Sequence, residues 1–582
     1  MVRKMSEREH TSIYFEAFLG VFGPGSDRVH LSIPPELSRN DVTLLARSSN
    51  LAVAGLKERS FPLQLSAQRP WSVVAAKGRP FPLNGALDFQ LSRDRIESDL
   101  KKLDGRFCIA AAGPDQLILA TDVLGASAIY YYQNPAGLIY FSTHLGILVA
   151  SLPTRPHLDD LGIAAMLAGS CCINGRTVYE GIRRLKAAQY LGATRDGGSV
   201  KWSISTYTSP ADCLSGSIPP FEHLDRRFGE LLCAAVDRER CSGDYALMLS
   251  AGLDSRAIAL ALVLNGNAEI DAATYGEWRS WDMRGARAFA ARHEMRHFPL
   301  PYGDWKMGSE ARTIAALSGG NAGLQVEHNS IGFKRAAKHF RRVAVGFLGG
   351  TLTGANLPKN GRTEYDVILN FKRLLREEVK AIFRDELHEI ESEIASEKDA
   401  LSGLSNTQKN LLLDWTIRQA TWISTTFDQC GWYLPICFPF YNRELMKFCF
   451  GLGREHLENQ RLYRSWVTRE TSSTARNLIH RRNLSWLVDE SRQRFLDIGA
   501  LCVPRMRAVS IIDWKMRTAP LLPWLRDLCS KVESAKLRSA MEAQLKPGTS
   551  EATLLLTGGA ALGTLGFPYD DENSAAPFQR MT

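Results

Sequence analysis

Residues 245–262 read Tyr-Ala-Leu-Met-Leu-Ser-Ala-Gly-Leu-Asp-Ser-Arg-Ala-Ile-Ala-Leu-Ala-Leu. The apolar run 245–249 is short enough for a buried strand of a parallel sheet. Small and hydroxyl-bearing residues follow at 250–255, and the Ala- and Leu-rich segment 256–264 favours a helix that stops at an Asn-Gly-Asn sequence. A strand, a tight loop and a helix start direct backbone N–H groups and a positive helix end at one point, which favours a phosphate chain. Asp254 is an anion like phosphate, so its expected role is to hold a magnesium ion that bridges to phosphate oxygens.

This loop resembles the pyrophosphate-binding sequence Ser-Gly-Gly-x-Asp-Ser of the ATP-pyrophosphatases in the asparagine synthetase superfamily. Ala251 replaces the first glycine and the other fixed positions match; a methyl group is tolerated there if φ is negative. The resemblance implies that the chain binds ATP and Mg²⁺, with Asp254 as the metal ligand. The phosphate-binding residues would be Ser250, Ala251, Gly252, Leu253, Asp254 and Ser255. The alternative is an ordinary strand-to-helix turn capped by Ser250 or Asp254.

Length and composition indicate a globular protein of several domains, because 45% of its 582 residues are hydrophobic. The net charge of +9 is a weak indication of acidic or phosphorylated ligands and does not by itself indicate nucleic acid. The 11 cysteines contain no Cys-x-x-Cys pair, which favours reduced thiols over disulfides or structural zinc. The charged start leads into no signal-peptide segment, and the apolar stretch 554–567 is short and glycine-rich. We expect a cytoplasmic protein with no nucleic-acid or membrane partner.

The N-terminal part, residues 1–205, is rich in β-favouring runs. Three ordered segments, 103–110, 122–131 and 138–144, resemble the glutaminase domain of class II amidotransferases. The matching residues are Asp122, Gly125, Tyr130, Tyr131, Phe141 and Ser142. In that family the nucleophile is a cysteine at position 2, where this chain has Val2. The resemblance therefore implies an Ntn-type β-sandwich with helices that does not hydrolyse glutamine, and Cys108, within an expected strand, cannot replace the nucleophile.

The remainder divides into an expected linker at 206–220, a synthetase-like domain at 221–545 and a flexible tail at 546–582. Strand and helix patterns alternate after the loop, with strands at 270–276 and 297–300 around a helix at 282–292. This order predicts a doubly wound parallel α/β sheet with helical additions and ligands at the carboxyl ends of its strands. The resemblance places adenine beside the backbone of Thr274 and Tyr275. The charged stretch 363–401 has the spacing of an exposed helix.

A second glycine-rich segment, 342–354, resembles the second nucleotide loop of the same superfamily. Gly346, Gly349 and Gly354 match, and the aspartate that binds a second magnesium ion in the family falls on Gly350. Asp254 with the phosphates and water could suffice for magnesium, or a carboxylate such as Asp282 or Glu327 could replace the missing aspartate. The alternatives are a chain that binds ATP poorly and a glycine-rich surface loop.

Two further motifs bear on the chemistry. The sequence His293-Glu-Met-Arg-His297 has the spacing of a zinc protease, but Phe298-Pro-Leu-Pro301 follows at once, so we expect the helix to end within or just after the motif. Further on, 438–448 resembles the acceptor segment of the superfamily with Asn442 in place of aspartate. Arg461 and Arg464 lie where the family has cations that offset charge on the leaving pyrophosphate, although arginines on a helix are usually solvated.

Together these resemblances imply an AMP-forming amide ligase in which the amine comes with the substrate. The departures look most like the lasso-peptide macrolactam synthetases, which join the N-terminal amine of a peptide to an Asp or Glu side chain. The implied partners are a leader-cleaved precursor peptide, a leader peptidase and a peptide-recognition protein. Two alternatives stay open: a small-molecule amide or β-lactam-forming synthetase, and a degenerate scaffold that only binds.

Overall fold

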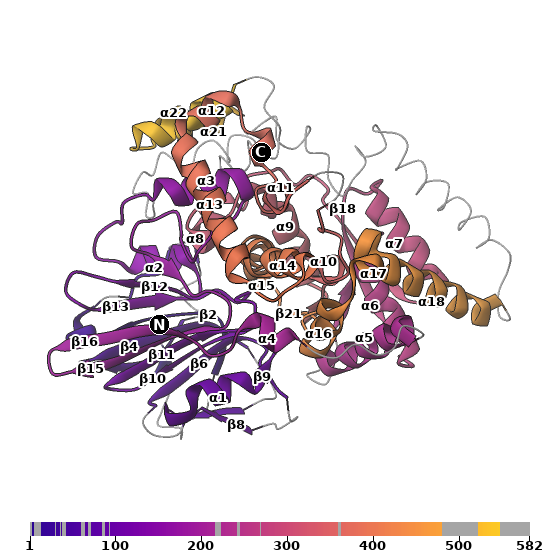
Figure 1. Ribbon diagram of the computed structural model, residues 1–582, viewed down its shortest axis with the longest axis horizontal. Helices are drawn as coiled ribbons and strands as arrows, with labels where there is room; N and C mark the ends of the chain where they lie inside the picture. The colour runs from indigo at the N-terminus through magenta and orange to yellow at the C-terminus, as the bar shows by residue number, and fades with distance from the viewer. Residues whose placement is uncertain are drawn as a thin grey trace.

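A computed structural model provides the structure of the chain (Figure 1). It describes residues 3–4, 13–29, 31–34, 36–37, 42–59, 64–67, 71–83, 88–91, 93–215, 223–240, 245–267, 269–358, 362–479 and 522–546. Val2 and the expected tail from residue 547 onward lie outside the described residues. The fold is mixed α/β, with a large curled sheet in the first part of the chain and a parallel sheet in the second.

The first sheet has 12 strands and branches at its central strand β2. One edge of β2 pairs with β4, and the other edge pairs with β6 near its start and with β13 near its end. The main path is β1 (Arg3–Lys4), β3 (Val42–Ser48), β4 (Leu51–Arg59), β2 (Ile13–Phe22), β6 (Val73–Gly78), β10 (Phe107–Ala112), β11 (Gln116–Thr121), β15 (Gln189–Asp196) and β16 (Ser199–Thr206). The branch is β13 (Ile139–Ser142), β12 (Tyr130–Gln133) and β14 (Arg183–Arg184).

Strand β10 shows why this sheet is covered on both faces. Side chains alternate across a strand, so Phe107, Ile109 and Ala111 enter one hydrophobic cluster. The intervening Cys108 and Ala110 enter another cluster on the opposite face. Every residue of β10 is buried, which is why the strand reads as a continuous apolar run.

Shorter elements complete this part of the chain. They are two-stranded pairs and short helices: β5 (Gln64–Ala67) with β8 (Asp88–Leu91), β7 (Phe81–Pro82) with β9 (Leu103–Asp104), η1 (Ser26–Arg28), η3 (Arg93–Arg95), α1 (Ile96–Lys101), α2 (Leu145–Ser151) and α3 (Asp160–Gly169).

The second sheet is parallel throughout and has the order β19 (Arg296–Pro301), β18 (Asp271–Gly276), β17 (Ala246–Met248), β20 (Val343–Ala344) and β21 (Ile436–Cys437). Strand β17 lies in the middle, with the next strand along the chain on one side and β20 on the other. The strand order therefore reverses at β17, which confirms the doubly wound prediction and places a topological switch point at the loop after β17.

Helices surround this sheet and extend beyond it. In Figure 1, α5, α6, α7 and α18 lie on the side of the molecule away from the first sheet. The helices are α4 (Pro210–Leu214), α5 (Leu224–Arg240), α6 (Leu253–Leu264), α7 (Trp281–Arg292), α8 (Ala311–Ser318), η5 (Leu324–Val326), α9 (Glu327–Ala336), α10 (Gly349–Leu352), α11 (Glu364–Ile368), η6 (Lys372–Leu374), α12 (Glu377–Ile382), α13 (Arg384–Ala400), α14 (Asn406–Leu413), the π-helix Asp414–Ile423, α15 (Ser424–Gly431), α16 (Arg443–Gly451), α17 (Arg454–Leu457), η8 (Glu458–Gln460), α18 (Arg461–Ile479), α21 (Leu522–Ser530) and α22 (Ala535–Gln544). No helix within the described ranges combines the length and apolar character needed to cross a membrane.

Two expectations about these regions need correction. The expected linker contains helix α4, whose Leu214 is fully buried in the main hydrophobic cluster. The charged stretch 363–401 is not one exposed helix but a series of short helices that ends in α13, and α13 buries Leu387, Ile390 and Ile394. The spacing of charged residues did not predict the burial of α13, because three apolar residues on one face are enough to pack a charged helix against the core.

The helix that carries the zinc-protease spacing ends before the motif. Helix α7 stops at Arg292, Glu294 has a left-handed φ of 55°, and His297 lies in strand β19. The two histidines therefore do not share a helical face, as expected. The helix ends earlier than the position within or just after the motif that the downstream prolines predicted.

Candidate functional site

The two serines of the loop between β17 and α6 hydrogen-bond to each other across the loop. The Ser255 hydroxyl accepts a hydrogen bond from the backbone N–H of Ser250 at 2.9 Å and lies 3.0 Å from the Ser250 hydroxyl. Gly252 is extended (φ −68°, ψ 157°) and exposed immediately before α6 begins. The hydroxyls thus hold the loop in shape, and the open N-terminus of α6 faces the switch point, where an anion is favoured.

Ala251 meets the condition that its methyl group requires. It is not among the non-glycine residues with positive φ in the described chain. Its backbone N–H donates to Asp282 Oδ1 at 3.0 Å, so the start of α7 is tied to the loop. Burial raises the pKa of Asp282, and the hydrogen bond from Ala251 acts in the opposite direction.

The second glycine-rich segment packs directly on Asp254. A Cβ atom at Gly346 would lie 2.6 Å from Asp254 Cβ, and one at Gly349 would lie 2.9 Å from Asp254 Oδ1. Gly350 also faces this carboxylate, and its backbone hydrogen-bonds to it. The two glycine-containing loops, 250–255 and 342–354, therefore meet at one carboxylate, and only glycine fits at the closest points.

Burial raises the pKa of Asp254 to about 6, and hydrogen bonds from Tyr463 and Gly350 limit the rise. The Tyr463 hydroxyl donates to Asp254 Oδ1 at 3.0 Å from a fully buried position. A carboxylate that is costly to ionise in isolation gains from a nearby cation, because an opposite charge favours the charged form.

The residues present suit a magnesium ion that keeps most of its ligands from phosphate and water. Asp254 and Asp282 both border the loop and offer the oxygen ligands that magnesium takes. Among the described residues no group of three or more His, Cys, Asp or Glu side chains could hold a metal ion by itself. Any metal at this loop would therefore depend on the phosphate chain.

Glu327 does not fit the role of replacement metal ligand. It is fully buried and accepts hydrogen bonds from the backbone N–H groups of Gly308 and Glu310, at 2.6 and 2.9 Å. The Trp305 indole and the Ser309 hydroxyl add further hydrogen bonds. Burial raises the pKa of Glu327 to about 7. This carboxylate holds the turn at 305–310, so the expectation for Glu327 was wrong.

Thr274 and Tyr275 lie at the carboxyl end of β18, beside the loop. The Thr274 hydroxyl donates to the Leu249 carbonyl at 2.7 Å, and its oxygen lies 2.9 Å from His297 Nε2. The Tyr275 hydroxyl donates to Asn329 at 2.6 Å. Their side chains are thus committed to internal contacts, which leaves the backbone as the part that could face a base.

The two predicted catalytic arginines are exposed at the start of α18. Arg464 donates to the Asn459 carbonyl at 3.0 Å, and no ion pair or hydrogen bond among the described residues joins Arg461 or Arg464 to the two loops. The residues of this segment that do reach the loops are Tyr463 and Gln460, whose amide donates to Thr353 at 3.1 Å. Neither residue is marked by charge in the sequence, because the buried positions of this segment carry neutral groups and the charged positions are exposed.

In the first part of the chain, Asp122 accepts hydrogen bonds from its own part and from the second part of the chain. Its carboxylate accepts from backbone N–H groups at Phe107, Leu124, Ala126 and Ser127. It also accepts from the hydroxyl of Tyr441. Burial raises the pKa of Asp122, and these hydrogen bonds oppose the rise. A residue of the amidotransferase-like pattern therefore joins the two parts of the chain.

Cys108 cannot act as the missing nucleophile. It is fully buried, and its thiol donates weakly to the Ala128 carbonyl at 3.5 Å. Burial raises the pKa of the Cys108 thiol to about 12. Since the thiolate is the reactive form, this cysteine is inert at neutral pH.

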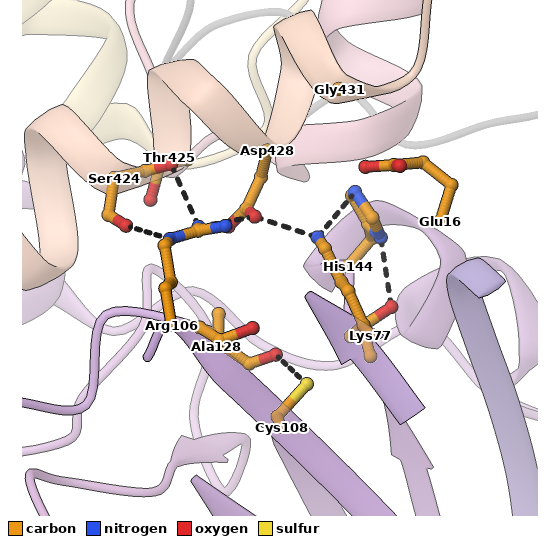
Figure 2. Close-up of polar contacts among 12 residues, drawn as sticks. Glu16, Lys77, Arg106, Cys108, Ala128, His144, Ser424, Thr425, Asp428 and Gly431 are labelled. Atoms are coloured by element: carbon orange, nitrogen blue, oxygen red, sulfur yellow. Dashed lines mark hydrogen bonds and ion pairs between the residues drawn. The ribbon is translucent and has the colours of Figure 1, made fainter. Parts of the chain in front are cut away.

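A buried charge cluster lies close by, between the first sheet and helix α15. Figure 2 shows Asp428 of α15 between Arg106 and Lys77. Asp428 Oδ1 lies 2.6 Å from Arg106 Nη2 and 2.7 Å from Lys77 Nζ, and the Ser424 hydroxyl accepts from Arg106 Nε at 2.8 Å. His144 Nε2 lies 3.4 Å from Lys77 Nζ, and burial lowers the pKa of His144 to about 3. The cluster is an electrostatic contact between the two parts of the chain.

Comparison with known proteins supports the amidotransferase likeness of the first part. Residues 93–207 match the family model described as a glutamine amidotransferase domain. Glutamine phosphoribosylpyrophosphate amidotransferase from B. subtilis, complexed with ADP and GMP, is 10% identical with a TM-score of 0.21, over 44% of this chain and 65% of that one. A structure described as the allosteric regulatory enzyme of purine biosynthesis is 10% identical with a TM-score of 0.22, over 52% of this chain and 77% of that one. No curated protein matches.

Proposed function

We propose that the chain is an ATP-dependent, AMP-forming amide ligase that closes a macrolactam in a ribosomal peptide. The observation that carries the proposal is the position of Asp254, where the β17–α6 loop and the second glycine-rich segment meet at a topological switch point. The substrate would be a leader-cleaved precursor peptide. A leader peptidase and a peptide-recognition protein would be its partners.

The residues of the loop would bind the nucleotide through its phosphates. Backbone N–H groups at the start of α6 would hold the β- and γ-phosphates, and Asp254 with Asp282 would hold Mg²⁺. Magnesium bound there would neutralise charge that develops on the departing pyrophosphate. Tyr463 orients Asp254 through its hydrogen bond, and Gly349 and Gly350 keep space beside the carboxylate.

The reaction would proceed in two balanced steps. An Asp or Glu side-chain carboxylate of the peptide attacks the α-phosphorus of ATP, and the bond to the β-phosphate breaks to release pyrophosphate. The N-terminal amine then attacks the activated acyl carbon, AMP leaves with the bonding electrons, and the amine loses a proton. Holding amine and acyl carbon on one peptide supplies much of the rate through orientation.

We expect that the first part does not hydrolyse glutamine, and this expectation supports an amine that comes with the substrate. Cys108 is buried as a thiol, and Asp122 of the amidotransferase-like pattern is saturated with internal hydrogen bonds. Among the described residues of the first part, Cys108, Cys171 and Cys172 are all buried, so none of these thiols is placed to release ammonia from glutamine.

The test is ATP–pyrophosphate exchange with candidate peptides, together with measurement of AMP. Exchange that requires an acidic side chain in the peptide supports the ligase, and exchange driven by small carboxylic acids alone favours the small-molecule alternative. Asp254→Ala should abolish AMP formation while the melting temperature is retained. A matched control is Asp271→Asn, at the opposite end of β18 in an exposed pair with Arg296, which should leave activity unchanged.

A binding scaffold is the second candidate, because Gly350 offers no second carboxylate and neither Arg461 nor Arg464 reaches the loops. No exchange with any peptide or small acid would favour the scaffold. Normal turnover by Asp254→Ala would overturn the metal assignment.

A further inference from the structure

A cavity of about 330 Å³ lies between the first part of the chain and its helical additions. The first part contributes segments 172–175 and 184–189 to its wall, and the additions contribute the end of α13, the end of α14 and the π-helix. This volume falls at the lower end of the range for small-molecule sites, about 300–1,000 Å³. None of the lining residues belongs to the two loops of the proposed nucleotide site, so the cavity is a separate feature.

Arg184 is a cation on the wall of this cavity, and it is only 6% exposed. Both hydrogen bonds of its side chain come from Nη2, which donates to the carbonyls of Gly125 at 2.8 Å and Ala420 at 2.7 Å. Nε is buried without a hydrogen-bond partner. Within the described part of the chain no carboxylate forms an ion pair with Arg184, although buried charges are normally paired.

The neighbouring charges on the wall are already neutralised. Lys186 Nζ lies 2.7 Å from Glu397 Oε1 and donates to Asn174 Oδ1 at 3.0 Å. Arg184 is therefore the unpaired positive charge among the lining residues of the cavity, and a single cation balances a singly charged anion rather than a doubly charged one.

The rest of the wall is mostly apolar. Leu185, Leu412 and Ile417 line it, and the hydroxyls of Thr416 and Thr421 donate to carbonyls one turn back, at 2.7 and 2.6 Å. Thr416, Ile417 and Thr421 belong to the π-helix. This helix type is rare and often occurs at functional sites.

We propose that this cavity binds a small monocarboxylate with an apolar body. The carboxylate accepts a hydrogen bond from Nη1 of Arg184, and the apolar part packs on Leu185, Leu412 and Ile417. Such a ligand supplies the counter-charge that the guanidinium lacks, through a charge-assisted hydrogen bond. The proposal does not depend on the nucleotide reaction.

The experiment is isothermal titration calorimetry of the full chain with N-acetyl-leucine, N-acetyl-leucinamide and inorganic phosphate. The acid should bind, and the amide and phosphate should bind at least about tenfold more weakly, because a tenfold change corresponds to about one charge-assisted hydrogen bond. Equal binding of acid and amide, preference for phosphate, or no binding of any probe overturns the proposal.

Single-residue variants test whether the ligand binds in this cavity. Arg184→Met should abolish binding of the acid, and Thr416→Trp should abolish it by filling the cavity while Arg184 stays intact. The second variant decides the matter if the first does not fold. Arg183→Met is the matched control, since Arg183 is the neighbouring residue of β14 and does not line the cavity. Retained binding in Thr416→Trp, or loss in Arg183→Met as well as in Arg184→Met, refutes the location.

Discussion

Replacing Asp428 with Asn should destabilise the contact between the two parts of the chain. The Asp428 side chain is 4% exposed, and its Oδ1 atom contacts both Lys77 Nζ at 2.7 Å and Arg106 Nη2 at 2.6 Å. Arg106 and Lys77 lower the pKa of Asp428 despite the opposing effect of burial, so the residue is ionised at neutral pH. The variant keeps the shape of the side chain and removes its charge, which leaves two buried cations without their anion.

The size of the effect follows from burial. Breaking a buried ion pair by removing one partner costs about 3–5 kcal/mol, because the remaining charge stays desolvated. Two cations share this carboxylate, so we expect a loss of unfolding free energy in the upper part of that range. An exposed pair contributes no more than about 1 kcal/mol. Glu230 is such a case, since it pairs with Arg226 and Arg227 and its side chain is 48% exposed.

Urea unfolding followed by tryptophan fluorescence measures the difference, with Glu230→Gln as the matched control. The Asp428→Asn midpoint should fall well below that of the control at equal slope. Adding Lys77→Met to Asp428→Asn should recover part of the lost unfolding free energy, because it removes one of the two buried cations that no longer have an anion. A loss under about 1 kcal/mol, equal to that of the exposed control, would refute the claim that this cluster holds the two parts together.

Three further outcomes are expected. Tyr463→Phe removes the hydroxyl that stabilises ionised Asp254, so the pKa of Asp254 should rise further. Pyrophosphate exchange should then fall about tenfold at neutral pH and recover partly at higher pH, where Asp254 is ionised again. An unchanged pH profile would contradict this role. Gly349→Ala places a Cβ 2.9 Å from the Asp254 carboxylate and should abolish ATP binding in calorimetry, whereas Gly198→Ala, with open space around its Cβ, should not. Burial lowers the pKa of His144 from its ordinary value of 6.5 to about 3 in the folded chain. The unfolded state therefore binds more protons between these values, and the free energy of unfolding should decline as pH falls through that window. If the urea midpoints of His144→Gln show the same decline, the pH dependence belongs to other groups.

The local sequence predicted much of the second half, because its signals depend on nearest neighbours. The apolar run before Ser250 became β17, and the Ala- and Leu-rich segment after it became α6. The two histidines of the zinc-protease motif share no helix, as expected, although the helix ends at Arg292, before the motif. Period, propensity and glycine placement are properties of ten or fewer residues, so they can be read without the fold.

The side-chain contacts at the candidate site were harder to predict from the sequence, even for residues that belong to a recognisable motif. Asp122 matched an amidotransferase pattern, yet its carboxylate binds the hydroxyl of Tyr441. Arg461 and Arg464 drew attention as charges, whereas their neighbour Tyr463 reaches Asp254. Glu327 looked available for a metal and is enclosed by four donors.

The sequence by itself determined the alternation of strands and helices in the second part of the chain and the position of the Ser- and Gly-containing loop between β17 and α6. Only the tertiary structure decided which groups meet: the second glycine-rich segment at Asp254, Asp428 between Lys77 and Arg106, and an unpaired Arg184 in a cavity. These partners are separated by tens to hundreds of residues in the chain. Their pairing depends on how whole sheets and helices pack, because burial sets both the cost of a charge and the distance to its partner.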